Sequence, residues 1–340
     1  MAIDVVDQVL DLYPGKPIYV YHEIVHNKHV VGRFRERGVK FIEDVAEAPE
    51  GSIIVFSAHG ISPAVREEAK ARSLTMVDAT CPLVTKVHNE AIRYARQGYD
   101  ILLIGHANHQ EVVGTRGEAP ESIQVVESPE DIPDLKIRDV NKIAYLTQTT
   151  LSTDDAEVII RALKKAFPTI KDPPSSDICY ATTNRQAAVR QIAPECDVVL
   201  VVGSKNSSNS VRLTEISKNA GCPAFLLDDV GELQDDWFRG LETPVHECTV
   251  LVTAGASAPE DLVAELCRTM IERYGKGHGM IEQRDIFRED EEFGLPATLK
   301  RLMRAEGIDP ESRKIKVGSY DITRESYGAV ALTVGGKTVG

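Results

Sequence analysis

The sequence lacks several patterns that would assign it to a common class. It has no C-x-x-C pair, the spacing of zinc ribbons and thioredoxin-type sites, and no apolar run of about 18 residues that would form a transmembrane helix. Neither G-x-x-x-x-G-K-[ST] nor G-x-G-x-x-G occurs, so nothing indicates nucleoside-triphosphate or dinucleotide binding. Basic residues are outnumbered, with 39 Lys and Arg against 52 Asp and Glu and a net charge of −13. We therefore expect no nucleic-acid partner, because nucleic-acid phosphates would be repelled.

Cysteine is also scarce, with six residues in a chain of 340. The acidic and periodic N-terminus does not resemble a signal peptide, so we expect a cytoplasmic protein without a membrane partner. Its cysteines are then expected to be free thiols or metal ligands rather than disulfides. The length allows two or three domains, and a hydrophobic content of 42% is enough for a core.

A repeated pattern of short apolar runs followed by polar residues predicts an α/β fold. Ser, Thr, Asn or His follows each run, and segments with apolar residues spaced at three and four lie between the runs. Continuous apolar runs are typical of parallel strands buried on both faces. The predicted strands are 17–21, 53–56, 101–104, 143–146, 198–202 and 250–253. The predicted helices are 2–13, 86–97, 154–167, 184–193, 210–219 and 258–273.

This pattern divides the chain into three similar α/β lobes at 1–80, 81–176 and 177–273, followed by a tail at 274–340 of different character. The first lobe begins with the helix predicted at 2–13 and has no strand before it, unlike the other lobes. We therefore expect the first lobe to be incomplete at its N-terminus. In parallel sheets ligands bind beyond the carboxyl ends of the strands, so the polar strand ends are candidates for a site.

The segment HEIVH at 22–26 matches the H-E-x-x-H motif of zinc hydrolases. The motif requires both histidines on one helix, whereas this match directly follows a predicted strand and lacks a downstream H-x-x-G-x-x-H extension. A zinc-dependent hydrolase that uses His22, Glu23 and His26 is therefore the less favoured alternative. The histidines at strand ends could instead bind phosphate oxygens. These histidines are His26, His59, His106 and His109.

Two loops between a predicted strand and a predicted helix have compositions suited to anions. They are GSKNSSNS at 203–210 and AGASAPE at 254–260. Ser257 and Glu260 fit a capping box and Pro259 suits an early helical position, so helix capping alone would explain these residues. A helix N-terminus also presents free N–H groups and a positive dipole end to an anion. Two such termini and several histidines could together bind a diphosphate.

Two of the six cysteines occupy matching positions in the repeat. Cys81 lies in DATCPLVTKVH at the start of the second lobe, and Cys179 lies in DICYATTNRQ at the start of the third. By symmetry a third cysteine is expected just before the first helix, upstream of Ala2. Three thiolates at one centre would suit an iron–sulfur cluster with one open iron. The other cysteines lie beside strands or on an apolar helix stripe and are expected to be buried thiols: Cys196, Cys222, Cys248 and Cys267.

Together these segments resemble the 4-hydroxy-3-methylbut-2-enyl diphosphate reductase family, from residue 2 to about 296. The resemblance rests, in the family's order, on HEIVHN, FSAHG, DATCPLVTKVH, IGHANHQEVVGT, TQTTLS, DICYATTNRQ, GSKNSSNS and TAGASAPE. It implies three parallel-sheet α/β lobes around a central [4Fe–4S] cluster. The implied reaction removes the substrate's allylic hydroxyl with two electrons and protons, the last step of the non-mevalonate isoprenoid pathway. It yields isopentenyl and dimethylallyl diphosphate, with ferredoxin or flavodoxin as the implied electron donor.

The resemblance also implies roles for individual residues. Cys81 and Cys179 would bind the cluster, Glu111 would donate a proton, and Thr149 would hold the substrate hydroxyl near the iron. The diphosphate would be bound by His26, His59, His109, Ser207, Ser208, Asn209 and Ser257. The family's first cluster cysteine, in a G-F-C segment, would lie upstream of Met1, and the tail carries no matching motif. A non-catalytic relative that binds diphosphate but holds no stable cluster is therefore a second alternative.

Overall fold

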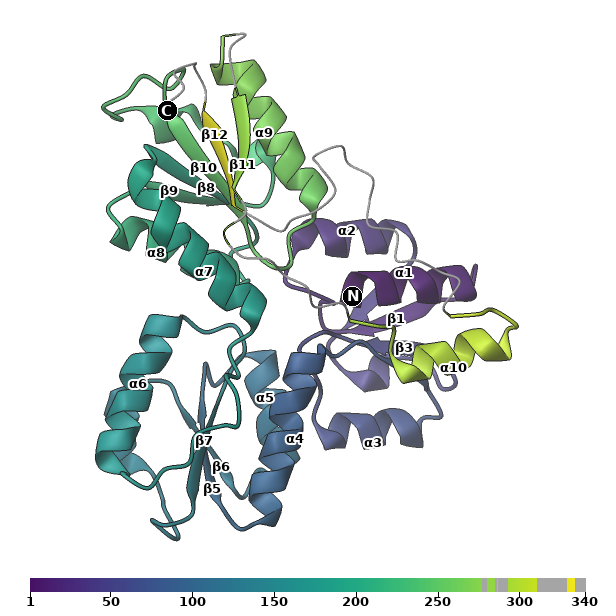
Figure 1. The fold of residues 1–340 in the computed structure, drawn as a ribbon. Coiled ribbons are helices and arrows are strands. Elements are labelled where there is room, and N and C mark those ends of the chain that lie inside the picture. The colour runs from purple at the N-terminus through teal and green to yellow at the C-terminus, as the bar shows by residue number, and fades with distance from the viewer. Residues whose placement is uncertain (277–279, 285, 287–292, 311–328, 334–340) are drawn as a thin grey trace. The chain divides into compact units, whose positions relative to one another are not determined.

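Three β-sheets, named A, B and C here, organise the chain (Figure 1). The computed structural model describes residues 1–276, 280–284, 286, 293–310 and 329–333. The chain divides into two units. Unit 1 contains Met1–Val25, Val30–Cys179 and Glu292–Lys316, and unit 2 contains His26–His29, Tyr180–Glu291 and Val317–Gly340. Within the described ranges, no helix is long and apolar enough to cross a membrane.

Sheet A, in unit 1, is a four-stranded parallel sheet with the order β2-β1-β3-β4. Its strands are β1 (Ile18–Tyr21), β2 (Lys40–Ile42), β3 (Ile53–Phe56) and β4 (Thr75–Asp78). One face packs against α1 (Ala2–Leu12), α2 (Lys28–Glu36) and α10 (Ala297–Ala305), and the other packs against α3 (Pro63–Ala71). Alternate residues of β1 point to the two faces, because Ile18 and Val20 join the first core and Tyr19 joins the second.

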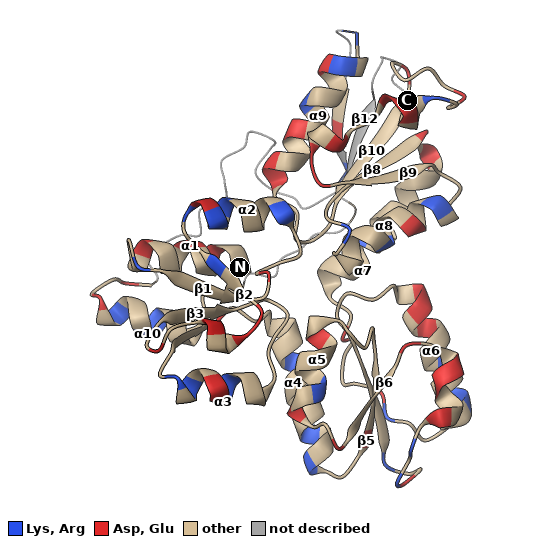
Figure 2. Cartoon of the chain, turned by 180° about the vertical axis from the view of Figure 1, so that it is seen from behind, with Lys and Arg blue, Asp and Glu red and all other residues tan. Residues whose placement is uncertain are grey.

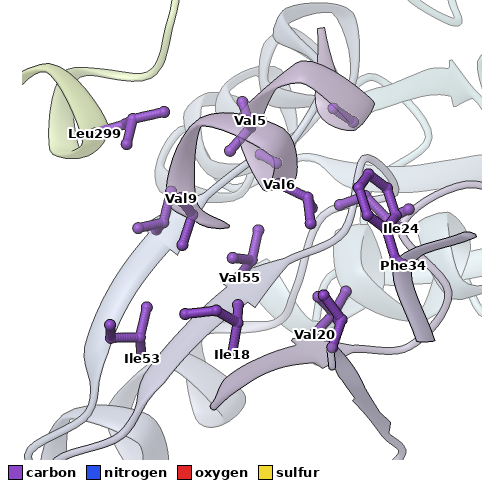
Figure 3. Packing of buried hydrophobic residues seen from close by; sticks show 14 of the residues in the cluster. Val5, Val6, Val9, Ile18, Val20, Ile24, Phe34, Ile53, Val55 and Leu299 are labelled. Atoms are coloured by element: carbon purple, nitrogen blue, oxygen red, sulfur yellow. The ribbon is translucent and has the colours of Figure 1, made fainter. Parts of the chain in front are cut away.

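The helix α10 brings part of the predicted tail into the core of sheet A. Leu299 is fully buried and Met303 is 1% exposed, and both belong to the same apolar cluster as Val5 and Val9 of α1. Figure 3 shows Leu299 beside Val5 and Val9, above Ile18 and Ile53 of the sheet. Residues far apart in the sequence therefore close one hydrophobic core.

Sheet B, also in unit 1, is a three-stranded parallel sheet with the order β6-β5-β7. Its strands are β5 (Asp100–Ile104), β6 (Ile123–Val126) and β7 (Ile143–Thr147). The helices α4 (Pro82–Arg96) and α5 (Gln110–Glu118) lie on one face and α6 (Thr153–Ala166) lies on the other (Figure 1). The centre of this lobe is thus a three-layer α/β sandwich.

Sheet C, in unit 2, has a parallel centre of β8 (Val198–Val202), β9 (Ala224–Leu227) and β10 (Thr249–Ala254). The helices α7 (Tyr180–Ile192) and α8 (Ser208–Asn219) pack on one face and α9 (Glu260–Tyr274) on the other. Two further strands, β12 (Ala329–Thr333) beside β10 and β11 (Met280–Arg284) beside β12, run antiparallel. The prediction of three parallel-sheet lobes is confirmed, while these two antiparallel additions to sheet C were not predicted.

The buried strands explain why the sequence pattern is so regular. No charged residue occurs in β1, β3, β7, β8 or β10, and Figure 2 shows Lys, Arg, Asp and Glu gathered on helices and loops. Helices on both faces leave no place for a charge that water could solvate. Short 3-10 helices connect the larger elements at Val45–Glu47, Pro129–Asp134, Ala193–Glu195, Val230–Glu232 and Asp235–Phe238.

We expect Leu299→Ala to lower the free energy of unfolding of the chain by about 2–5 kcal/mol, because it leaves a cavity between α10 and α1. Arg301→Ala on the same helix is the matched control, since Arg301 is exposed and its loss should change stability by less than about 0.5 kcal/mol. Urea unfolding of both variants measures the difference. Equal stability of the two variants would contradict the contribution of α10 to this core.

Candidate functional site

In unit 1, four predicted site residues lie just beyond the carboxyl ends of parallel strands. His59 follows β3, Cys81 follows β4, His109 follows β5 and Thr149 follows β7. The strands of each parallel sheet end at the same edge, so their following loops share one side of that sheet. The strand-end positions identified in the sequence are therefore real features of the fold.

Glu111 is buried beside Thr149 and bonded to it twice. Its Oε1 accepts a hydrogen bond from the Thr149 backbone N at 2.6 Å, and its Oε2 accepts one from Thr149 Oγ1 at 2.9 Å. Burial raises the pKa of Glu111 to about 7, the hydrogen bonds from Thr149 act in the opposite direction, and the charge of Asp177 raises it further. A carboxyl with this pKa can hold and release a proton near neutral pH.

His109 and Glu111 share one helix terminus. His109 is the N-cap of α5, and its Nδ1 accepts a hydrogen bond from the Glu111 backbone N at 3.2 Å. The rings of His59 and His109 meet edge to face, with centroids 5.7 Å apart. Two histidines that follow strands of different sheets therefore lie together, and one of them is bonded to the backbone of the buried acid.

Glycines on α5 allow this approach between the two lobes of unit 1. A Cβ at Gly117 would lie 2.4 Å from the Cβ of Ser62, and one at Gly114 would lie 3.4 Å from the backbone of Gly60. Gly60 itself has a φ of +81°, a conformation that favours glycine. The loop that carries His59 therefore rests directly on the backbone of α5.

Cys81 and Cys179 both lie in unit 1. Cys81 is the N-cap of α4, and its backbone N donates to the carbonyl of Ala58 at 3.0 Å. Burial raises the pKa of the Cys81 thiol, and the nearby charges of Cys179 and Glu111 raise it further, against the backbone amides of Leu83 and Val84. Both thiols are partly exposed. Two sulfur donors close enough to influence each other are compatible with a shared metal centre.

Thr149 links the second of these cysteines to the buried acid. The backbone N of Cys179 donates to the Thr149 carbonyl at 2.9 Å, while the amide and hydroxyl of Thr149 bind Glu111. Hydrogen bonds thus connect Cys179, the predicted cluster ligand, through Thr149 to Glu111, the predicted proton donor. The sequence analysis named all three residues but not their mutual bonds.

The remaining cysteines belong to unit 2, where Cys222, Cys248 and Cys267 are buried and Cys196 is partly exposed. Cys222 and Cys248 donate from Sγ to the carbonyls of Cys196 and Thr243, each at 3.2 Å. Burial raises the pKa of Cys222 and Cys248 to about 11 and that of Cys196 and Cys267 to about 12. Since these thiols lie among the apolar residues of unit 2, they could bind a metal together only after rearrangement.

In unit 2, the N-terminus of α8 carries a buried amide without a hydrogen-bond partner among the described residues. The Asn209 side chain is buried, and neither its oxygen nor its nitrogen has a hydrogen-bond partner within the described part of the chain. Ser207 is the N-cap, and its Oγ accepts from the backbone N of Ser210 at 3.4 Å and from its Oγ at 3.0 Å. Ser208 is half-buried in the first turn. An unsatisfied buried amide at a helix N-terminus indicates a place for a polar ligand.

The loops after β8 and β10 approach each other through two glycines. A Cβ at Gly203 or at Gly255 would lie 2.1 or 2.0 Å from the Oγ of Ser210. The backbone N of Gly255 also donates to the Val202 carbonyl at 2.9 Å. The two anion-type loops predicted from the sequence are therefore neighbours at the same end of sheet C.

Ser257 does not form the predicted capping box. The N-cap of α9 is Pro259, which makes no side-chain cap, and the Ser257 hydroxyl instead donates to the His26 carbonyl at 3.1 Å. The capping-box prediction is wrong because this contact over a long sequence separation competes for the hydroxyl. It places His26 and Ser257 together in unit 2.

Lys28 is a residue of this region that the sequence analysis missed. Its Nζ lies 2.9 Å from Asp228 Oδ2 and 2.7 Å from Glu232 Oε1, and both carboxylates raise its pKa. Its backbone N donates to Ser204 Oγ at 3.3 Å. These bonds anchor the segment 26–29 to unit 2. The only feature of the sequence that could have indicated this role is the basic residue directly after HEIVHN.

The zinc-hydrolase alternative fails on geometry. Residues 22–27 are not helical, and α2 begins only at Lys28. His22 has a φ of +60°, and its Nδ1 lies 2.5 Å from Glu43 Oε2. An H-E-x-x-H motif needs both histidines on one helix face, so this segment does not form one.

Comparisons with known proteins agree with the arrangement of these motifs. A family model described as LytB protein matches residues 1–271. A 4-hydroxy-3-methylbut-2-enyl diphosphate reductase from Acidothermus cellulolyticus is 50% identical over 318 residues, covering 93% of this chain and 90% of that protein. The enzyme of the same name from Nocardia farcinica is 51% identical, covering 89% of this chain and 88% of that protein. The first of these matches reaches beyond residue 296, into the segment without recognised motifs.

Solved structures give the same result. The E-1-hydroxy-2-methyl-but-2-enyl-4-diphosphate reductase from Plasmodium falciparum superposes with a TM-score of 0.82 at 38% identity, covering 90% of this chain and 94% of that one. A structure of (E)-4-hydroxy-3-methyl-but-2-enyl diphosphate reductase, described as the terminal enzyme of the non-mevalonate pathway, gives a TM-score of 0.57 at 30% identity. It covers 80% of this chain and 93% of that one.

The raised pKa of Glu111 predicts a pH dependence of stability. The folded pKa of about 7 exceeds the ordinary value of 4.5, so the unfolded chain releases this proton first. The Glu111 contribution to the free energy of unfolding therefore falls as pH rises from about 4.5 to 7, by on the order of 3 kcal/mol, and is constant above that range.

Urea unfolding of cluster-free protein between pH 5 and 8 measures this dependence, with Glu111→Gln as the reference that cannot titrate. The stability of the wild-type chain relative to this variant should decrease from pH 5 to about 7 and then level off. Parallel stability curves for the two proteins would contradict the raised pKa.

Proposed function

The chain belongs to the LytB family, and on that premise we propose that it reduces 4-hydroxy-3-methylbut-2-enyl diphosphate to isopentenyl and dimethylallyl diphosphate. The reaction removes the allylic hydroxyl of the substrate as water, using two electrons and protons. The observation that carries the proposal is the buried Glu111 carboxyl, bonded to Thr149 next to Cys179. Reduced ferredoxin or flavodoxin is the proposed electron donor.

Cys81 and Cys179 are the proposed thiolate ligands of a [4Fe–4S] cluster. Both sulfurs are partly exposed in unit 1 and would supply two of the three thiolates expected for the cluster, while the other four thiols lie in unit 2. When bound, such a cluster would supply electrons and a Lewis acid for the hydroxyl oxygen. The backbone bonds of Cys81 to Ala58 and of Cys179 to Thr149 would hold the two sulfurs in place.

Glu111 is the proposed proton donor to the departing hydroxyl. Burial raises its pKa to about 7, so a large share of the carboxyl carries the proton that a general acid requires near neutral pH. Thr149 holds the carboxyl through its amide and hydroxyl, so the acid has a fixed orientation. The Thr149 hydroxyl can also contact the substrate hydroxyl, which would place that group beside the acid.

The substrate diphosphate is proposed to bind at the N-terminus of α8. The Asn209 amide offers a donor that no described residue uses, and the helix dipole favours the negative charge. Ser207, Ser208, Ser257 and His26 are the proposed further contacts in unit 2. His59 and His109 of unit 1 are also proposed to contact the diphosphate.

Anaerobic reconstitution tests the function directly. The reconstituted chain should contain iron and sulfide and should convert the substrate to the two diphosphate products with a chemical reductant. Protein that binds pyrophosphate but holds no cluster would favour the non-catalytic relative. Protein that contains zinc and hydrolyses the substrate would favour the hydrolase, although residues 22–27 do not form the helix that its motif needs.

We expect Glu111→Gln to slow turnover by roughly 10²–10⁴-fold with little change in KM, because general acid catalysis is lost while the diphosphate contacts remain. Steady-state kinetics on protein of matched iron content measure the effect. Turnover within a few-fold of the wild-type chain would remove Glu111 from this role.

We expect Asn209→Ala to weaken pyrophosphate binding by roughly tenfold or more, the value of one hydrogen bond to a charged group. Its free energy of unfolding should change by less than about 1 kcal/mol, because no hydrogen bond to the side chain is lost. Calorimetric titration measures the affinity. Asn219→Ala, at the exposed far end of the same helix, is the matched control. Equal affinities of the two variants would exclude Asn209 from the diphosphate site.

A further inference from the structure

A lysine on α4 is bound to the segment that leads into Cys179. Lys86 Nζ donates to the carbonyls of Ser175 at 3.1 Å and Ser176 at 3.0 Å, and to Asp177 Oδ1 at 3.1 Å. An ammonium group has three protons, so these three acceptors match its full donor capacity. Neither the sequence analysis nor the proposed mechanism uses this residue.

Asp177 continues the connection into sheet B. Its side chain is fully buried, and its Oδ2 accepts a hydrogen bond from the backbone N of Thr147 at 3.1 Å. Thr147 is the last residue of β7. One carboxylate therefore joins α4 to the end of β7, an outer strand of sheet B. Since a buried carboxylate is costly without partners, its two bonds fix its place.

Both partners are close in sequence to a proposed cluster ligand. Lys86 follows Cys81 by five residues on α4, which is about 7.5 Å along a helix. The Cys81 carbonyl accepts the hydrogen bond of Thr85 N at 2.9 Å, so Cys81 moves with the first turn of that helix. Asp177 precedes Cys179 by two residues, and Cys179 N is held by the Thr149 carbonyl at 2.9 Å. The ion pair thus joins the two backbone segments that carry the two sulfurs.

We propose that Lys86 and Asp177 are positioning residues that set the spacing between Cys81 and Cys179. This inference rests on the proposed function, in which these two cysteines bind one cluster. Without the ion pair, α4 and the segment 175–179 would be joined less directly, through sheet B and the loops around it. The pair then acts on the cluster through its ligands and contacts neither substrate nor iron.

The double variant Lys86→Met/Asp177→Asn separates this role from simple stabilisation. It removes both charges at once, so no unpaired buried carboxylate remains to unfold the lobe. Lys70→Met is the matched control, because Lys70 is 70% exposed on α3 of the same unit. Lys86→Gln, which removes the positive charge but keeps a hydrogen-bond donor for Asp177, is the second variant if the double variant does not fold.

The first measurement needs no cluster. Reduced apoprotein is treated with dibromobimane, a short reagent that bridges two adjacent thiols, and the Cys81–Cys179 crosslinked peptide is quantified by mass spectrometry. The wild-type chain and Lys70→Met should form this crosslink readily. The double variant should form it roughly tenfold to a hundredfold more slowly, as expected when two reacting groups lose their alignment. Lys86→Gln should lie between them.

The second measurement is cluster lifetime in reconstituted protein challenged with an iron chelator. The double variant should lose its cluster roughly ten- to a hundredfold faster than the wild-type chain, the usual cost of removing support behind metal ligands. Thermal melting of each apoprotein is recorded alongside. Slower crosslinking with near-normal melting supports the positioning role.

Wild-type crosslinking rate and cluster lifetime in the double variant would overturn the proposal, whatever its melting temperature. If only Lys86→Gln folds, its wild-type behaviour in both measurements would overturn it equally. A wild-type chain that crosslinks readily but retains no iron and sulfide would count against the proposed function instead. The two failures are therefore distinguishable.

Discussion

The hydrogen bonds of Thr149 are the interaction on which the site in unit 1 depends. Its amide and hydroxyl bind the carboxyl of Glu111, and its carbonyl binds the backbone of Cys179. A buried carboxyl group needs such partners, because water cannot reach it. One residue at the end of β7 therefore fixes the acid and the cysteine in a common frame. In unit 2 the Ser257 hydroxyl has a comparable effect by holding the segment of His26.

The sequence predicted the fold where strands are buried on both faces. All six predicted strands are present, because continuous apolar runs such as VVLVV of β8 have no other stable environment here. The parallel strands that it missed lie at sheet edges and are only half-buried: β2, β4, β6 and β9. The helix α5 was missed because Gly114 and Gly117 weaken its pattern. Gly117 is needed for the close contact with Ser62, and Gly114 lies beside Gly60 in the loop of His59.

The site was predictable only in part. Motifs identified the family, which the comparisons confirm, and with it the candidate residues Cys81, Cys179, Glu111 and Thr149. Their mutual bonds join residues far apart in the chain, and no local pattern encodes such pairs. The same holds for Ser257, whose capping role was predicted locally and lost to a distant carbonyl. The comparison of the three lobes also did not identify Lys28 or Lys86, because their partners lie far away in the sequence.

The packing of α10 on α1 has a consequence for how the chain is made. The last strand of sheet A ends at Asp78, yet the core beneath the sheet still lacks Leu299 and Met303 at that point of the chain. The ribosome adds about 220 further residues before Leu299 exists, which takes on the order of 10–40 s at typical rates of synthesis. During that interval the apolar surface around Val5 and Val9 has no cover from α10. The core of this lobe is thus completed only after the residues of sheet B and of the parallel centre of sheet C have been translated, and a chaperone has that interval in which to protect it.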